Sequence, residues 1–274
     1  MNTTKIDKKA LTVPLIAAAV LLLTLILCLF LIPKNKPDPP AATEATVPET
    51  TSPYLSEVFS YEGDYLTCLT RESIPGIDVS NHQGDIDWEQ VRLSGIQFAF
   101  IRVGYRGTDL GNVYEDERAQ QNYAGAKKAG IKIGGYFFSQ AVSVEEAMEE
   151  ASFALSVTKD WEMDLPLVYD WEYTGEDTRV ARVSDRTVTD CTAAFCRAVE
   201  EAGRKSMVYC NPYQYRELLM PQELPGLPLW YAEYTDAPTL PRATVFWQYT
   251  ETGSVPGIAG NVDIDLYFPP KPLA

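Results

Sequence analysis

Histidine is almost absent from this chain: one is present among 274 residues. A single imidazole excludes His-rich metal sites and any mechanism that needs two imidazoles, and the five cysteines contain no C-x-x-C pair, which excludes a zinc ribbon. Positive charge is also scarce, because 23 Lys and Arg face 38 Asp and Glu for a formal charge of −15. Such a surface repels phosphate backbones, so we expect no nucleic-acid partner. Carboxylates remain as the abundant reactive groups.

One long apolar run stands near the start of the chain. Residues 11–32 contain no charge, and about 20 such residues in a helix span a bilayer core. Lysines flank the run on both sides, so the positive-inside bias is modest. We predict a single-pass cell-membrane anchor, with residues 1–10 in the cytoplasm and the rest of the chain outside the cell. A cleaved signal peptide is the alternative, but its apolar region is usually about 7–15 residues and ends at a small-residue cleavage site.

A proline-rich segment follows the apolar run. Residues 33–53 hold six prolines among Thr, Ala and Glu, which predicts an extended extracellular linker. Beyond it the composition is that of a globular domain, with 18 basic and 34 acidic residues and a charge of −16. No repeat and no second linker divides this part. We therefore expect one monomeric globular domain at 74–274, preceded by a lead-in segment at 54–73 to which we assign no role.

The globular part alternates short apolar runs with longer amphipathic ones. Asp87 and Ser143 are placed as N-caps of helices, and Gly130 and Gly203 as C-terminal glycines. Strand–helix alternation predicts a parallel sheet, and eight strands predict a closed, modified TIM-like α/β barrel with five βα units and three further strands. The expected strands are 75–79, 98–103, 132–138, 167–171, 206–210, 228–232, 245–249 and 262–266, and the expected helices are 87–93, 115–129, 144–158, 184–202 and 212–220.

Acidic residues occupy several of the predicted strand ends. Asp78 ends the first strand, Asp170 and Glu172 end the fourth, and Asp263 and Asp265 lie in the last. Carboxylates at positions i and i+2 of a strand point to the same face, about 7 Å apart, so Asp170 and Glu172 are expected to enter one space. Acids are disfavoured in strands. Their presence at three strand ends of a barrel, where active sites lie, therefore indicates a functional site.

The chemistry that fits such a group is glycoside hydrolysis. One carboxylic acid protonates the leaving oxygen, while a second group stabilises the oxocarbenium-like centre or activates water. Crowding raises one pKa, so that this acid stays protonated near neutral pH. A metal site or a structural network is the alternative explanation for the acids. Aromatic residues near the strand ends supply surfaces for stacking sugars, with core packing as the alternative for each: Tyr105, Tyr136, Phe138, Trp171, Trp230, Tyr231, Trp247 and Tyr249.

An ordered series of motifs resembles glycoside hydrolase family 25, the Chalaropsis-type lysozymes. The series covers nearly all of residues 74–268, and its order is far more specific than any one fragment. The matching fragments are 76–88 (GIDVSNHQGDIDW), 98–107 (FAFIRVGYRG), 122–130 (NYAGAKKAG), 135–139 (GYFFS), 170–172 (DWE), 230–234 (WYAEY), 247–249 (WQY) and 257–265 (GIAGNVDID).

The resemblance implies a barrel of five βα units and three further strands that cleaves the β-1,4 bond between N-acetylmuramic acid and N-acetylglucosamine in peptidoglycan, with no metal or cofactor. It matches Glu172 to the general acid and Asp170 to the partner that assists the substrate's acetamido group or orients water. Asp78 and Asp263 match two further acids of the site. Besides the aromatic residues, the matching fragments add Arg102, Gln248 and Asp265 to the expected substrate-binding residues.

Other readings remain open at this point. A barrel that binds peptidoglycan without cutting it, or a glycosidase for another N-acetylated glycan, shares most of these features, and a structural scaffold explains the anchor and linker but not the acids. The lone His82 is expected to be a loop residue near the site rather than a metal ligand. The cysteines of the globular part are expected to be small buried residues rather than disulfides: Cys68, Cys191, Cys196 and Cys210.

Overall fold

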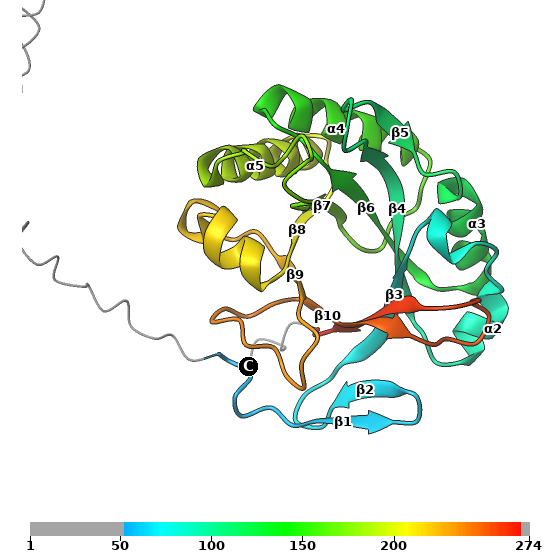
Figure 1. Ribbon diagram of the computed structural model, residues 1–274. Coiled ribbons are helices and arrows are strands. Elements are labelled where there is room, and N and C mark those ends of the chain that lie inside the picture. Colours follow the sequence, from blue (N-terminus) through cyan, green and yellow to red (C-terminus); the bar gives the residue numbers. More distant parts are fainter. Residues whose placement is uncertain (1–51, 270–274) are drawn as a thin grey trace, which may run out of the picture. The chain divides into compact units, whose positions relative to one another are not determined.

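A computed structural model describes residues 52–269 of the protein. Eight strands form a closed barrel, because β3 pairs with β11 on one side and with β4 on the other. Figure 1 shows the ring of strands with helices on its outside. The predicted eight-stranded α/β barrel is confirmed. In ring order the strands are β3 (Ile74–Val79), β4 (Phe98–Arg106), β6 (Lys132–Ser139), β7 (Leu167–Trp171), β8 (Ser206–Cys210), β9 (Leu229–Ala232), β10 (Phe246–Gly253) and β11 (Val262–Tyr267).

The last strand, β11, is antiparallel to its neighbours, so the prediction of a parallel sheet is wrong there. Neighbouring strands from β3 through β10 pair in parallel, whereas β11 is antiparallel to both β10 and β3. The start of β11 therefore lies at the carboxyl ends of the other strands. This direction places Asp263 directly opposite Asp78 in the ladder.

Four α-helices follow the first four barrel strands. Their N-caps include the predicted Asp87 and Ser143, and Gly130 ends α3 in the left-handed conformation, as predicted. The helix expected from 115 begins later, because β5 (Val113–Glu115) pairs with β4 first. After β8, a π-helical turn, Gln214–Leu218, replaces the expected α-helix. The helices are α2 (Trp88–Leu93), α3 (Ala119–Ala129), α4 (Val144–Val157) and α5 (Asp185–Glu201).

Aromatic rings fill the interior of the barrel below the carboxyl ends of its strands. Phe100 stacks on Trp230 with ring centroids 4.6 Å apart, and Phe98 meets Phe246 edge to face at 5.2 Å. Glycine makes room for this layer, since a Cβ on Gly76 or on Gly134 would lie within 2.4 Å of a phenylalanine ring. The rings are almost completely buried. They close the barrel beneath its carboxyl ends.

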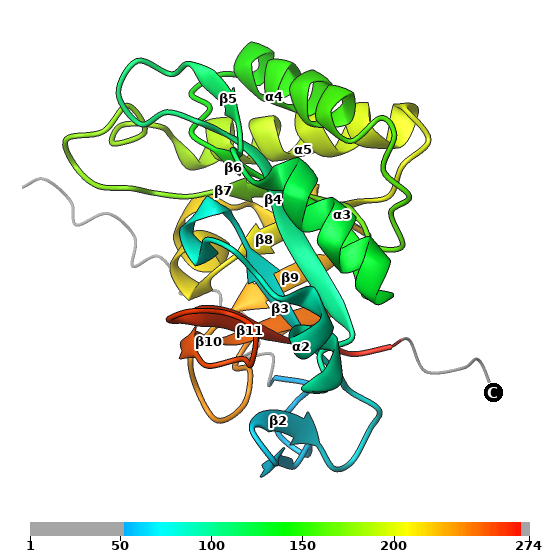
Figure 2. The same ribbon diagram turned by 90° about the vertical axis from the view of Figure 1, so that its right-hand side faces the viewer.

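Residues before β3 cover a side of the barrel that has no helix. There the chain forms a hairpin of β1 (Phe59–Glu62) and β2 (Tyr65–Cys68), which lies beside β10 and β11 in Figures 1 and 2. The Phe59 ring packs edge to face on Trp247 at 5.1 Å, and the Leu66 amide donates to the Tyr249 hydroxyl at 3.2 Å. The lead-in segment is thus packed against the outer face of the barrel.

Tyr54 fixes the beginning of this segment. Its hydroxyl donates to the Thr244 carbonyl at 3.0 Å and accepts from the Thr244 amide at 2.8 Å, and its ring lies 5.5 Å from that of Phe268. Only 2% of Tyr54 is exposed. These contacts join residues almost 200 positions apart in the sequence.

The four cysteines of the described part are buried and unpaired, as predicted. The predicted anchor at 11–32 and nearly all of the predicted linker lie outside the described residues. Within residues 52–269, no helix has the length and apolar character needed to cross a membrane.

Replacing Tyr54 by alanine tests whether the lead-in segment is part of the barrel. We expect Tyr54→Ala to lower the free energy of unfolding by about 3 kcal/mol, because a buried ring and its hydrogen bonds are lost. Urea unfolding measures the change. Tyr61→Ala on the same hairpin is the matched control, since Tyr61 is 64% exposed, and its effect stays within about 0.5 kcal/mol. Equal effects of the two substitutions would contradict the assignment.

Candidate active site

A cavity of about 550 Å³ opens at the carboxyl ends of the barrel strands. Alternation along each strand decides what enters it, because every second side chain points inward. The cavity is lined by Asp78, Ser80, His82, Gln83, Arg102, Tyr136, Phe138, Asp170, Glu172, Tyr209, Asn211, Pro212, Trp230, Ala232, Glu233, Tyr234, Gln248, Glu251 and Asp263.

The four acids expected from the sequence meet in this cavity. Asp170 and Glu172 enter it together from the end of β7, as the i, i+2 spacing predicts. Asp78 comes from β3 and Asp263 from the start of β11. One oxygen of Asp170, Oδ1, is buried without a hydrogen-bond partner among the described residues. The site thus brings four carboxyl groups together, of which those of Asp78 and Asp170 are buried.

Gln248 links one of these acids to the opposite wall of the cavity. Its amide nitrogen donates to Oδ2 of Asp78 at 2.7 Å. Its carbonyl oxygen accepts from the hydroxyls of Tyr209 at 3.2 Å and Tyr234 at 3.0 Å. The Asp78 carboxylate is therefore oriented by an amide that two phenols hold in turn.

Arg102 is the one cationic residue that lines the cavity. Its Nε donates to Asp116 at 2.8 Å and its NH2 group donates to the Asn81 side chain at 2.6 Å, while Asp116 also accepts from the Asn81 amide. This brace fixes the guanidinium. Its positive charge opposes the rise in the pKa of Asp170.

Burial raises the pKa of every acid in the cluster. For Asp170, burial and then the negative charge of Glu172 raise the pKa; for Glu172, burial and then Asp263 do so. For Asp78, burial, Asp263 and Asp265 all raise the pKa. Burial and the nearby Glu251 raise the pKa of Asp263 to about 6. Raised pKa values favour the protonated form of a carboxyl group, as a general acid requires.

The expected substrate-binding residues divide according to the strand alternation. Arg102, Gln248, Tyr136, Phe138 and Trp230 line the cavity. Other expected residues lie outside it, because each follows or precedes an inward position and so points to the outer layer. These are Trp171, whose Nε1 donates to the Ala141 carbonyl, Trp247, whose Nε1 donates to the Glu233 carbonyl, and Tyr231 and Tyr249, which are packed in the outer core.

Two further expected residues also lie outside the cavity. Tyr105 packs against Tyr114 with ring centroids 5.4 Å apart and lies under the Arg102 guanidinium. Asp265 is completely buried beneath the floor, where its Oδ1 accepts from Nε1 of Trp230 at 2.7 Å. Asp265 therefore holds a floor residue in place rather than facing the open space.

The sequence argument missed several residues of the wall. Tyr209 could have been found, because it is two positions after inward Met207 on a predicted strand. Asn211, Glu233 and Tyr234 lie in loops, where no periodicity indicates direction, and Pro212 begins the helical turn after β8. His82 lies in a short 3-10 turn, Asn81–Gln83, and lines the cavity.

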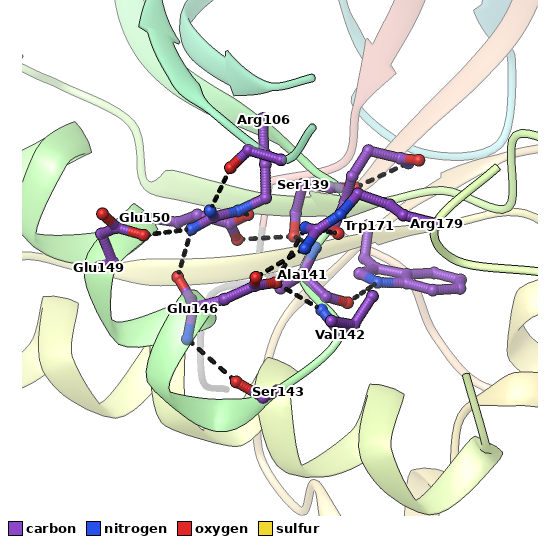
Figure 3. A network of polar contacts seen from close by, with 12 residues as sticks. Arg106, Ser139, Ala141, Val142, Ser143, Glu146, Glu149, Glu150, Trp171 and Arg179 are labelled. Carbon is purple, nitrogen blue, oxygen red and sulfur yellow. Dashed lines mark hydrogen bonds and ion pairs between the residues drawn. The ribbon is translucent and has the colours of Figure 1, made fainter. Parts of the chain in front are cut away.

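A network of ion pairs behind the cavity holds the loops that follow β4, β6 and β7 (Figure 3). Arg106 donates to Glu150 and to Glu149, each at 2.7 Å, and Glu150 accepts from the Ser139 hydroxyl at 2.6 Å. Arg179 pairs with Glu146 at 2.6 Å. Burial raises the pKa of Glu150 to about 7, although the bonds from Ser139 and Arg106 lower it.

The network reaches Glu172 through Gln140. Arg179 donates to the Gln140 carbonyl at 2.7 Å, and the Gln140 amide donates to the Glu172 carbonyl at 2.6 Å. Gln140 is completely buried. The backbone that carries Glu172 is therefore fixed from behind by a satisfied polar network.

Comparison with known proteins identifies the family of this barrel. The sequence profile of "Glycosyl hydrolases family 25" matches residues 77–258, about two thirds of the chain. The chain belongs to glycosyl hydrolase family 25. The motif resemblance found in the sequence is confirmed.

Individual family 25 relatives match the same region. The autolytic lysozyme of Clostridium acetobutylicum is 30% identical over 193 residues, which are 70% of this chain and 55% of that protein. Lysozyme M1 of Streptomyces globisporus is 30% identical over 202 residues, covering 69% of this chain and 66% of that protein. The chain thus spans between half and two thirds of these relatives' length. The bacterial lysozyme structure from Streptomyces coelicolor superposes with a TM-score of 0.61 at 28% identity, covering 72% of this chain and 92% of that one.

Removing one acid of this family 25 site should stabilise the fold in a pH-dependent way. The pKa of Asp263 in the folded protein, about 6, lies above its unfolded value, so stability falls as pH rises from about 4 through 6. We expect Asp263→Asn to match the wild type at pH 4 and to exceed it by up to about 3 kcal/mol at pH 7. Urea unfolding across this range measures the difference.

The control for this prediction is Asp160→Asn, which removes one negative charge from a side chain that is 88% exposed. Its effect on stability should remain within about 0.5 kcal/mol at every pH. A stability gain of Asp263→Asn that is the same at pH 4 and pH 7 would show that burial of the ionised carboxylate is not its cause.

Proposed function

We propose that the chain is a peptidoglycan hydrolase that cleaves the β-1,4 bond between N-acetylmuramic acid and N-acetylglucosamine. One observation carries the proposal: four acids with raised pKa values, two of them buried and two half-buried, meet in one cavity of a family 25 barrel. Two relatives that are 30% identical over 193 and 202 aligned residues are named lysozymes. A binding module without catalysis gives no reason for four acids with raised pKa values in one cavity.

Glu172 acts as the general acid. It gives its proton to the glycosidic oxygen while the bond from that oxygen to the anomeric carbon breaks. Burial and the charge of Asp263 raise the pKa of Glu172, which favours the protonated form that a general acid needs. After the leaving sugar departs, water adds to the anomeric carbon and returns a proton to Glu172.

Asp170 supports the positive charge that develops on the sugar. It lies beside Glu172, where its carboxylate orients the substrate's acetamido group or a water molecule. The braced Arg102 favours the ionised form of Asp170, in opposition to burial. Asp78, oriented by Gln248, and Asp263 line the cavity beside this pair.

Replacing Glu172 by glutamine tests this assignment. We expect Glu172→Gln to reduce the release of muropeptides from purified cell walls by about 10²–10⁴-fold, because the proton donor is lost while the shape is kept. Mass spectrometry of the products should show new reducing ends on muramic acid. Glu145→Gln, an exposed position on α4, is the control and should keep full activity. Reducing ends on glucosamine, or equal release by Glu172→Gln and wild type, would refute the proposal.

We also propose that residues 11–32 anchor the enzyme in the cell membrane, with the catalytic domain outside the cell. The support is the uncharged run itself and the proline-rich stretch that separates it from the barrel. A tether of this kind keeps the local enzyme concentration high near the wall. It also offsets the repulsion between an acidic domain and an anionic wall.

Membrane fractionation tests the anchor. We expect the full chain to stay in the membrane pellet after alkaline carbonate washing, and the double variant Leu21→Lys, Leu22→Lys to be released, since each central lysine costs about 3 kcal/mol. N-terminal mass determination of the mature protein is the second readout. Loss of residues 1–32 from the mature chain would instead identify a cleaved signal peptide.

A further inference from the structure

Two exposed tyrosines lie at the edge of the active-site cavity. Tyr173 directly follows Glu172 after β7, and Tyr213 directly follows Pro212 after β8. Their ring centroids are 6.3 Å apart, with the planes inclined by 62°. The exposed fractions are 37% for Tyr173 and 51% for Tyr213. Both rings therefore present apolar surface to solvent beside residues that line the cavity.

Packing does not account for these two rings. Neither tyrosine belongs to the apolar layer inside the barrel or to the layer between the strands and helices. Neither hydroxyl has a hydrogen-bond partner within residues 52–269, whereas the buried Tyr54, Tyr169 and Tyr209 hydroxyls do. Exposed apolar surface beside a cavity is typical of a ligand-binding groove.

The backbone on both sides of Tyr173 is held rigidly. Completely buried Gln140 donates to the carbonyl of Glu172 at 2.6 Å, and its own side-chain oxygen accepts from the Thr174 hydroxyl at 2.7 Å. One amide thus clamps the residues before and after Tyr173. Arg179, paired with Glu146, holds the Gln140 carbonyl in turn.

A second buried amide holds Tyr213. The Gln214 side chain accepts from the Asn211 amide at 2.7 Å, while the Asn211 side chain accepts from the Gln214 amide at 2.9 Å. The Gln214 side-chain nitrogen donates to the carbonyl of Trp171 on β7. The turn that carries Tyr213 is therefore tied to the strand that leads to Tyr173. A surface held in this way loses little freedom when a ligand binds.

We propose that Tyr173 and Tyr213 form an additional saccharide-binding site, which stacks a sugar ring of the β-1,4 glycan strand outside the cavity. This inference rests on the proposed function. A pyranose ring has an apolar face of C–H groups and a polar edge of hydroxyls and acetamido groups, and each tyrosine offers an apolar face and a free hydroxyl. Uncharged stacking also suits a domain of charge −16, which cannot attract an anionic wall by electrostatics.

The site makes activity depend on glycan length. Long strands reach from the scissile bond in the cavity to the tyrosines, whereas short fragments fill the cavity alone. We expect the double variant Tyr173→Ala, Tyr213→Ala to raise KM for long glycan strands about tenfold, the loss of two stacking contacts. Its kcat/KM on muropeptide tetrasaccharides should equal that of the wild type. Tyr173→Phe with Tyr213→Phe should retain most of the affinity, because the rings remain.

Binding provides a readout that does not require cleavage. In the full chain carrying Glu172→Gln, sedimentation with purified peptidoglycan should show about tenfold weaker binding when both tyrosines are replaced by alanine. Tyr61→Ala on the hairpin, an exposed tyrosine that does not line the cavity, is the control and should bind as before. Unchanged thermal melting establishes that the variants are folded.

The outcomes separate this inference from the proposed function. Equal losses on long and short substrates, or unchanged binding of the double alanine variant to peptidoglycan, would overturn the tyrosine site. A wild-type chain that cleaves neither substrate would refute the proposed function, and the binding comparison would still decide the tyrosine site.

Discussion

The antiparallel pairing of β11 with β3 is the constraint on which the rest of the structure depends. It joins the last strand to the first and so closes the sheet without a free edge. Because β11 runs against its neighbours, its first residues reach the carboxyl ends of the parallel strands. Asp263 then stands opposite Asp78, and the cavity has a wall on that side. An open sheet of the same residues would expose both carboxylates to water, and their pKa values would then stay near those of ordinary aspartate side chains.

The buried acids are unfavourable for folding, and the structure offsets this cost in the surroundings. Burial raises the pKa values of Asp78, Asp170 and Glu172, which means that the ionised forms destabilise the fold. Around them, hydrogen bonds from Gln248 and the Gln140 amide fix geometry rather than neutralise charge. The compensating stability comes from the ring layer below and from the outer apolar layer. The destabilisation that the buried acids cause is thus offset by packing elsewhere in the structure.

Local patterns in the sequence were sufficient to predict the strands and the acids that line the cavity. Short apolar runs between longer amphipathic ones identified the eight strands, and the i, i+2 spacing placed Asp170 and Glu172 in one space. The same alternation, applied strictly, excludes Trp171 from the cavity, since it stands between two inward residues. The direction of β11 and the β1–β2 hairpin could not be read in this way. They depend on partners far along the chain, such as Phe59 on Trp247 and Tyr54 on Thr244.

The aromatic rings that close the barrel limit how a polymer can approach the cavity. Phe98, Phe100, Trp230 and Phe246 fill the barrel completely, and Gly76 and Gly134 allow them to approach so closely. The cavity is therefore blind-ended, and no strand can thread through the barrel. A long chain can only lie across the opening, and both pieces must leave by the side on which they arrived. Under the proposed function, attack at an internal linkage of the glycan then requires no free chain end.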